Sequence, residues 1–272
     1  MKGKAKSRTI ILIVITIITV ALVACNQHQK IEAYEAYEIY DNAAAEINEA
    51  VGVVIDRTKE LVPENASDWE ALNVTIMDHI EIDKSTKETI QMMETTTVIA
   101  LTEDGEKRNT ANSYYKDEYV FVEAQNYDQS TERYKYPSST LQSKAYITSR
   151  LIFTFPADSV LDTKIVEEED YFIFTFHIRG TEAYSFMNDG IDYNTLDPAD
   201  KQKIQLSDAI FTSVIDKKTR QLIEAKFNYE NSFQDDDYTT WNNSYKNRIF
   251  NIKLDYVEIK FPNNLDDYPK RN

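Results

Sequence analysis

The chain has 272 residues, of which 42% are hydrophobic and 28% charged, and its formal net charge is −16 at pH 7. Nucleic acid and anionic lipid headgroups repel such an acidic chain, which argues against nucleic-acid binding and against a polybasic membrane-surface protein. The single cysteine excludes an intramolecular disulfide and has no partner for a metal site. A Gly-rich phosphate loop, a Gly-x-Ser-x-Gly elbow and a His-Glu-x-x-His helix are all absent, so we expect a non-catalytic protein without a cofactor.

The first 24 residues are typical of a bacterial lipoprotein signal peptide. A mostly apolar run from Ile10 to Ala24 follows four basic residues and is itself followed by Cys25. A positive n-region, a short apolar region and a small residue before the cleavage point are what export requires, and Cys25 supplies the thiol for lipidation. As a helix the run would span about 22 Å, short of the roughly 30 Å hydrocarbon core, so an uncleaved transmembrane anchor is the weaker alternative.

We therefore expect a protein held on the extracytoplasmic face of the cell membrane by lipid on Cys25. Residues 1–24 form the signal peptide, 25–30 the lipidated tether and 31–272 a single domain, since no Pro-, Gly- or Ser-rich linker and no repeat interrupts the chain. Loss of the four basic residues with the signal takes the formal net charge to −20. The high Lys, Asn, Ile and Tyr content, with scarce Gly and Pro, is typical of a low-GC Gram-positive genome.

The first folded element is predicted to be one long amphipathic helix that Pro63 ends. Its apolar residues recur mainly at three- and four-residue steps, which is the helical period. The stripe consists of Tyr40, Ala43, Ile47, Val51, Val54 and Leu61. We expect this helix to lay one side on an apolar surface.

From residue 72 onward the hydrophobic period changes to two, which predicts a series of β-strands rich in Tyr, Phe, Val, Ile and Thr. Short connections between the strands imply antiparallel neighbours. The predicted strands are 73–82, 87–102, 109–116, 119–126, 131–136, 161–167, 170–179, 204–216, 220–232 and 245–261.

Three of these strands carry finer predictions. Alternation over 223–230 indicates that one face of the sheet is solvated. The apolar parity of the last strand switches at Tyr256-Val257, which predicts a β-bulge there. The segment 171–176 is apolar on both parities, so we expect a central strand that is covered on both faces.

Two short helices are predicted between runs of strands. Ser138 or Ser139 would cap a helix that carries Leu141, Ala145, Thr148 and Ile152. Thr181 would cap a second helix, with Ala183, Tyr184 and Met187, that ends near Gly190. This order predicts an α+β fold, an antiparallel sheet with its helices gathered on one face, and argues against a parallel nucleotide-binding sheet.

Two segments carry a family resemblance. One is Tyr114-Tyr115-Lys116-Asp117-Glu118-Tyr119-Val120-Phe121-Val122 with Arg133-Tyr134-Lys135-Tyr136, and the other is Ile259-Lys260-Phe261-Pro262 with Leu265-Asp266-Asp267-Tyr268. Together with the lipobox Leu22-Val23-Ala24-Cys25 and the long first helix, these two segments resemble LolA/LppX-type envelope lipoproteins. The Gram-positive members of that group have a similar Tyr-rich hairpin before a Lys-rich strand. The likeness covers most of residues 30–268. It departs at Glu118, where a glycine would be expected, and in the acidic loop 188–200.

The resemblance implies a half-barrel, a curved antiparallel sheet whose concave apolar face is closed by the helices and, in relatives, holds a lipid or acyl chain. The candidate ligand-binding residues on that face are Phe172, Phe174, Phe176 and Tyr229. The same side chains would serve equally as a filled core, because any sheet under a helix layer needs apolar residues there.

Three function classes follow, of which the first is a carrier or sensor for a lipid or other apolar ligand. The second is an interaction module that docks on another envelope protein, with Tyr238, Trp241 and Tyr245 as its candidate patch or, alternatively, as packing beneath their loop. An enzyme that uses a carboxylate pair comes third. Two acidic clusters, Asp189, Asp192, Asn194 and Asp197 in one and Asp235, Asp236 and Asp237 in the other, fit solvated loops better than a cation site, so no metal site is predicted.

Overall fold

The computed structural model describes residues 31–63, 71–85, 90–116, 119–137, 151–187, 192–234 and 240–271. Several sequence predictions lie outside these residues: the signal peptide with Cys25, most of the helix after Ser138, Asp189, residues 235–237 and Tyr238. Within the described part of the chain, no helix has the length and apolar character needed to cross a membrane.

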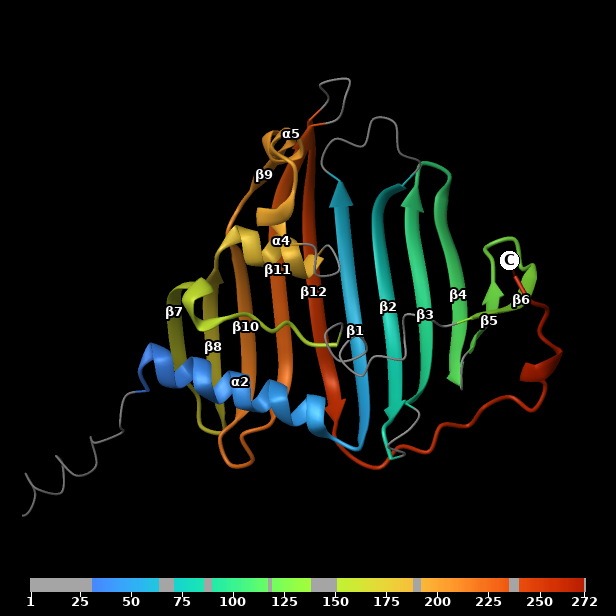
Figure 1. The fold of residues 1–272 in the computed structure, drawn as a ribbon, viewed down its shortest axis with the longest axis horizontal. Helices are drawn as coiled ribbons and strands as arrows, with labels where there is room; N and C mark the ends of the chain where they lie inside the picture. Colours follow the sequence, from blue (N-terminus) through green and yellow to red (C-terminus); the bar gives the residue numbers. More distant parts are fainter. Residues whose placement is uncertain are drawn as a thin grey trace, which may run out of the picture.

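The described chain forms one open antiparallel sheet of 12 strands (Figure 1). Its order is β6-β5-β4-β3-β2-β1-β12-β11-β10-β8-β7, and β9 pairs with β11 off this path. The strands are β1 (Gly52–Pro63), β2 (Ala71–Asp83), β3 (Gln91–Thr102), β4 (Gly105–Lys116), β5 (Tyr119–Gln125), β6 (Thr131–Pro137), β7 (Val160–Glu167), β8 (Tyr171–Ile178), β9 (Ile204–Leu206), β10 (Ala209–Asp216), β11 (Leu222–Gln234) and β12 (Thr240–Lys253). The antiparallel sheet and most of the predicted strands are thus confirmed.

The described ranges contain three α-helices, of which the first, with 17 residues, is the longest. They are α2 (Ala33–Glu49), α4 (Gly180–Met187) and α5 (Pro198–Lys203), with single 3-10 turns at Ala157–Ser159, Tyr193–Thr195 and Leu265–Asp267. Figure 1 shows α2 and α4 on the same face of the sheet, over β7 to β12. We call this the inner face and the opposite side the outer face.

The first predicted helix is wrong in its second half, because α2 ends at Glu49 and the chain continues as β1. The residues after Ala50 include Val51, Val53, Val54 and Ile55, and such a β-branched run favours an extended chain. At Gly52 a Cβ atom would lie 2.0 Å from the carbonyl oxygen of Asp255. The change from helix to strand therefore occurs beside Gly52, whose lack of a side chain lets the backbone of Asp255, just after the end of β12, approach the start of β1.

The second short helix forms two residues earlier than predicted, because a Thr181 cap would place its first helical residue at 182. It begins at Gly180, whose backbone N–H donates to Oδ1 of Asp208 at 3.0 Å. Thr181 consequently lies inside the first turn and does not cap the helix. In the other predicted helix only Ile152 of the four apolar residues is described, and it lies in a turn before irregular chain.

The last strand is shorter than predicted, since β12 ends at Lys253 and Tyr256-Val257 lies beyond it. A bulge does occur in β12, several residues earlier. Val54 of β1 pairs with Lys253 and Asp56 with Phe250, so β12 has one extra residue, and Asn251 there has a φ of 52°.

Strand β8 is not central, contrary to the prediction from its two apolar parities. It lies next to the edge strand β7, and only its even-numbered residues from Phe172 to Ile178 are buried. Tyr171 and His177 on the outer face are exposed. A strand second from the edge therefore carries apolar residues on a face that no described element covers.

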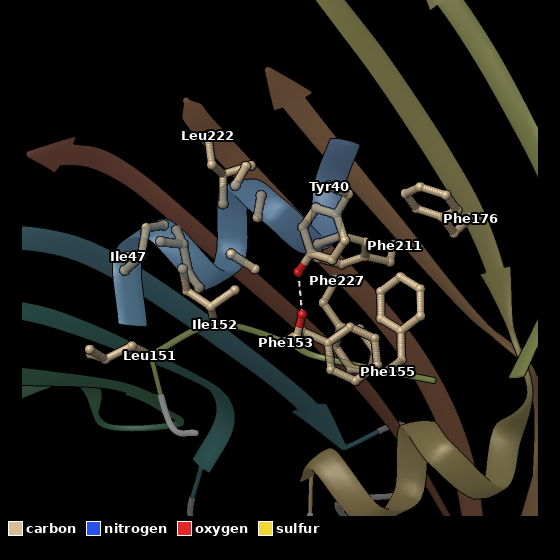
Figure 2. Packing of buried hydrophobic residues seen from close by; sticks show 14 of the residues in the cluster. Tyr40, Ile47, Leu151, Ile152, Phe153, Phe155, Phe176, Phe211, Leu222 and Phe227 are labelled. Atoms are coloured by element: carbon tan, nitrogen blue, oxygen red, sulfur yellow. Dashed lines mark hydrogen bonds between the residues drawn. The ribbon is translucent and has the colours of Figure 1, made fainter. Parts of the chain in front are cut away.

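The main core lies between the inner face and α2, with the irregular segment 151–155 between them. Figure 2 shows Tyr40 of α2 among Phe153, Phe155, Phe176 and Phe211, and its hydroxyl donates to the carbonyl oxygen of Phe153. The ring centroids of Tyr40 and Phe211 are 4.8 Å apart. This aromatic packing fills the space between helix and sheet over β7 to β11.

A second, smaller core lies on the outer face beneath the C-terminal tail, residues 254–271. It consists of Tyr114, Phe121, Leu265 and Tyr268. The tail also pairs with β6, because the N–H of Lys135 donates to the carbonyl of Pro269 and the N–H of Arg271 to the carbonyl of Lys135. One edge of the sheet is thereby covered.

Candidate functional site

The candidate ligand-binding aromatic residues lie in the main core. Phe174 and Phe176 have no exposed surface, and Phe172 and Tyr229 are buried. The ring centroid of Phe176 is 5.9 Å from that of Tyr40 and 5.5 Å from that of Phe155. These positions correspond to the filled-core alternative, and ligand binding by these four residues stays a prediction.

A charged cluster lies on the inner face of β1, β2 and β3, beside the aromatic core. The guanidinium of Arg57 is 2.6 Å from Oδ2 of Asp78 and 3.6 Å from Oε1 of Glu94. Cross-strand register brings the three side chains together, because Arg57 pairs directly with Asp78 and Glu94 lies one inner-face position away on β3. We call Arg57, Lys59, Asp78 and Glu94 the inner-face charge cluster.

Hydrogen bonds hold the carboxylates of this cluster. The hydroxyl of Thr96 donates to Oδ1 of Asp78 at 2.9 Å, and the hydroxyl of Tyr115 donates to Oε2 of Glu94 at 3.3 Å. The ammonium of Lys59 lies 3.7 Å from Asp78. Asp78 is therefore contacted from both neighbouring strands, β1 and β3, whereas Glu94 is contacted from β4 and, through Arg57, from β1.

Burial shapes the electrostatics of the cluster. Desolvation, together with the nearby charge of Asp78, raises the pKa of Glu94 above its ordinary value, although Arg57 and Lys59 oppose the shift. The side chains of Arg57 and Asp78 are almost fully buried. Removing charges from water costs free energy that pairing only partly repays, so such a cluster is weak evidence for a purely stabilising role.

An apolar strip adjoins the cluster on the same strands, toward the Pro63 end of β1. Leu61 pairs with Val74 and Val74 with Ala100, while Ile76 pairs with Val98. These five side chains share the inner face and are only partly buried. In the described part of the chain, α2 and α4 pack against β7, β9, β10 and β11, away from this strip.

Two polar atoms at the border between the core and the strip make no hydrogen bond of good geometry with the described residues, although the side chain of Asn231 lies close to the first of them. They are the hydroxyl oxygen of Tyr229 on β11 and Oδ1 of Asn247 on β12. Tyr229 is 1% exposed and Asn247 9% exposed.

Sequence reasoning missed the charge cluster, although one signal was present. On β2 the inner-face parity reads Val74, Ile76, Asp78, Ile80, Ile82, so a single acidic residue interrupts an apolar row. A charge at a core position of a strand marks either a mistake in the strand assignment or a site that needs the charge.

The other predicted positions divide into packed and undescribed residues. The Tyr245 ring stacks on Tyr229 with centroids 6.2 Å apart and is partly buried, which fits the packing alternative. The side chain of Trp241 lies outside the described part. In the acidic loop, Oδ1 of Asp192 accepts from the N–H of Asn194 at 2.8 Å. Over the described ranges, no three His, Cys, Asp or Glu side chains are grouped to hold a metal ion.

Comparisons with known proteins give little beyond the chain's own residues. No protein-family model matches the chain, and no curated protein matches it. Among solved structures, the crystal structure of LprF from Mycobacterium bovis is similar at a TM-score of 0.40, with 9% sequence identity over 85% of this chain and 97% of that one.

Proposed function

We propose that the protein is an extracytoplasmic lipoprotein, anchored to the cell membrane by lipid on Cys25, that binds an apolar or amphiphilic ligand on the inner face of its sheet. Binding is non-catalytic and needs no cofactor. The half-barrel expected from the sequence, curved around this ligand, is part of the proposal.

One observation carries the proposal: a partly buried apolar strip lies beside a buried charge cluster on the face that also bears the core. A face that only packed a core would be apolar throughout, because buried charges cost more free energy than apolar residues of the same size. A surface that is apolar on one side and polar on the other suits an amphiphile.

The second candidate is an interaction module of an envelope complex. Two large apolar side chains on the outer face favour it: Met77 is 46% and Leu101 49% exposed. Exposed apolar residues on a regular sheet face are a common feature of protein-binding surfaces.

Photo-crosslinking tests the ligand proposal. Isolated membranes that contain the full chain are incubated with an acyl probe carrying a diazirine and an alkyne, irradiated, and the labelled fraction of the protein is measured. Val74→Glu places a carboxylate directly between Leu61 and Ala100 of the strip and should lower labelling at least about tenfold, since an unpaired carboxylate beside an acyl chain is costly.

Ile210→Glu is the matched control, because Ile210 is exposed on the outer face of β10. It should label like the wild type. Absence of labelling in the wild type, or equal labelling of the two variants, would overturn the ligand proposal and leave the interaction module.

A further inference from the structure

The two edges of the sheet end differently. The C-terminal tail pairs with β6 at one edge, whereas β7 is the last strand at the other edge and pairs only with β8 among the described elements. Figure 1 shows β7 at the end of the row of strands, and α2 contacts it on the inner face. The free side of β7 is therefore the open edge of the described sheet.

Backbone groups of β7 point toward this open edge at every second residue, as in any antiparallel pair. The N–H of Glu168 donates to the carbonyl of Tyr171 at 2.9 Å, which fixes the residues that bond to β8. Counting back from Glu168, the N–H and C=O groups of Thr163 and Ile165 are among those that face outward. Such groups are a template on which another strand can pair.

The side chains of β7 have the same chemistry in both directions from Thr163. The seven residues from Val160 to Val166 are, in order, two apolar, one acidic, one hydroxyl, one basic and two apolar residues. Asp162 and Lys164, on either side of Thr163, are exposed on the outer face. Neither of them forms an ion pair with a described residue.

A second copy of β7, placed antiparallel along this edge, matches the first copy residue by residue. With Thr163 opposite Thr163 of the other copy, Asp162 faces Lys164 twice, and Leu161 faces Ile165 twice. Opposite charges directly across a strand pair stabilise the pairing, as do apolar pairs. A twofold axis through Thr163 produces this register, and twofold symmetry is the commonest in homo-oligomers.

Edge strands often carry charges and bulges that prevent pairing, and β7 has both. Leu161 is an extra residue, since Val160 pairs with Ile178 and Asp162 with His177. Protection alone, however, does not call for opposite charges at equal distances from one residue. Leu161 is also 51% exposed, and a large apolar side chain at an open edge is a liability unless it is covered. The pattern favours a paired edge over a protected one.

The geometry of such a pair also suits two chains held at one surface. The twofold axis is perpendicular to the sheet, so the inner faces of both copies, with their α2 helices, lie on the same side. Seven strand residues extend about 23 Å and form a small interface, which is weak between freely diffusing molecules. Anchoring both copies in one membrane would raise their effective concentration.

We propose that β7 pairs with β7 of a second copy of this chain, antiparallel and centred on Thr163, so that the two sheets become one continuous sheet. The partner is identified by the charge complementarity of the strand with itself. This inference does not depend on ligand binding at the inner face.

Thr163→Cys tests the register, because a residue on the twofold axis lies opposite its own copy. The Cα atoms of such a hydrogen-bonded pair are about 5.5 Å apart, within the range for a disulfide. The full chain in isolated membranes is oxidised, and the fraction that migrates as a dimer without reductant is measured. We expect at least about tenfold more dimer than in the wild type, whose only cysteine is Cys25.

Ile165→Cys is the matched control on the same open edge. Its copy would lie four residues away along the strand, about 13 Å, so this variant should form no more dimer than the wild type. A second test uses two exposed positions and does not depend on the fold of Thr163→Cys. Differently tagged Asp162→Cys and Lys164→Cys chains, expressed together, should crosslink to each other at least about fivefold more than either does to itself.

Charge reversal separates specific pairing from chance collision. In the Thr163→Cys chain, Lys164→Glu places a carboxylate opposite Asp162 and should lower the dimer fraction at least about fivefold. Adding Asp162→Lys restores opposite charges across the pair and should return the fraction to within about twofold of the original.

Three results would overturn the proposal. The first is the absence of dimer both in Thr163→Cys and in the mixed pair, and the second is equal crosslinking of Ile165→Cys and Thr163→Cys. The third is a crosslink of Thr163→Cys to a different polypeptide, which would show that another protein's strand occupies the edge. A dimer fraction that Lys164→Glu leaves unchanged would contradict the register centred on Thr163.

Discussion

Arg57 holds two carboxylates from neighbouring strands, and little of the three side chains is exposed. Such an arrangement is sensitive to the loss of Arg57, because Asp78 and Glu94 would then face each other with only the more distant and more exposed Lys59 as a counterion. The ion pair between Arg133 and Glu123 has the same shortest distance, 2.6 Å, but its side chains are 50% and 28% exposed. Water screens that pair, so geometry alone does not decide what an ion pair contributes.

Arg57→Met should therefore lower the free energy of unfolding by about 3–5 kcal/mol, the range for breaking a buried ion pair. Arg133→Met, the matched control, should lower it by less than about 1 kcal/mol. Chemical denaturation of the two variants at neutral pH measures the difference. If the two variants lost the same free energy of unfolding, the inner-face charge cluster would be solvated and its ion pairs would contribute no more to stability than a surface pair.

Residues of this cluster also explain why the sequence misled at β1. The inner-face parity of the strand is Val53, Ile55, Arg57, Lys59 and Leu61, so two cations replace apolar residues in the middle of the alternation. What remained visible was a partial helical spacing through Val51, Val54 and Leu61. A local pattern fails in this way where buried charges interrupt it, and here the misassigned segment contains half of the candidate charge cluster.

Among the elements, the C-terminal tail has the clearest structural role. It packs Leu265 and Tyr268 against Tyr114 and Phe121 on the outer face. It also pairs with Lys135 of β6, which would otherwise present unpaired backbone groups at that edge. The nitrogen of the Lys135 side chain donates to the carbonyl of Asp266 at 2.7 Å. The tail therefore joins the end of the chain to a strand more than a hundred residues earlier.

Deleting residues 265–272 should lower the free energy of unfolding by roughly 3–6 kcal/mol, since two buried apolar side chains contribute about 1.5–3 kcal/mol each. The uncovered β6 edge should also promote self-association, which light scattering detects. Tyr256→Ala, in the same tail but at a residue 66% exposed, should change stability by less than about 0.5 kcal/mol. A truncated chain that stayed monomeric and equally stable would contradict this role.

Local periodicity predicted most strands but not the course of the tail. Ile259 and Phe261 continue an alternating apolar pattern, and yet this segment is not a strand. The backbone leaves the sheet near Gly52, where the carbonyl of Asp255 approaches, and its apolar residues then cover the outer face of other strands. Alternation of apolar residues predicts which side chains of an extended segment are buried, but it does not predict which surface of the protein they pack against.

At the scale of the whole molecule, the net charge of the domain determines how strong its membrane anchor must be. The formal net charge of −16 would become −20 after loss of the four basic residues near the N-terminus. An anionic membrane surface repels such a domain, and two or more acyl chains on one cysteine would overcome that repulsion where a single chain gives only marginal binding. If the domain works at a membrane, Cys25 is the residue on which its location depends.

Cys25→Ser tests this dependence because the chain has no other cysteine. In a bacterial host fed an alkyne analogue of palmitate, the wild type should take the label, and its N-terminal peptide should begin at Cys25 with the mass of the attached lipid. The serine variant should take no label and should retain residues 1–24, because cleavage follows lipidation of the thiol and serine has no thiol. An uncleaved anchor predicts instead that both proteins keep the first 24 residues and have the same unlabelled N-terminus. In that case the apolar run from Ile10 to Ala24 would itself hold the domain at the membrane, despite being shorter than the roughly 30 Å hydrocarbon core.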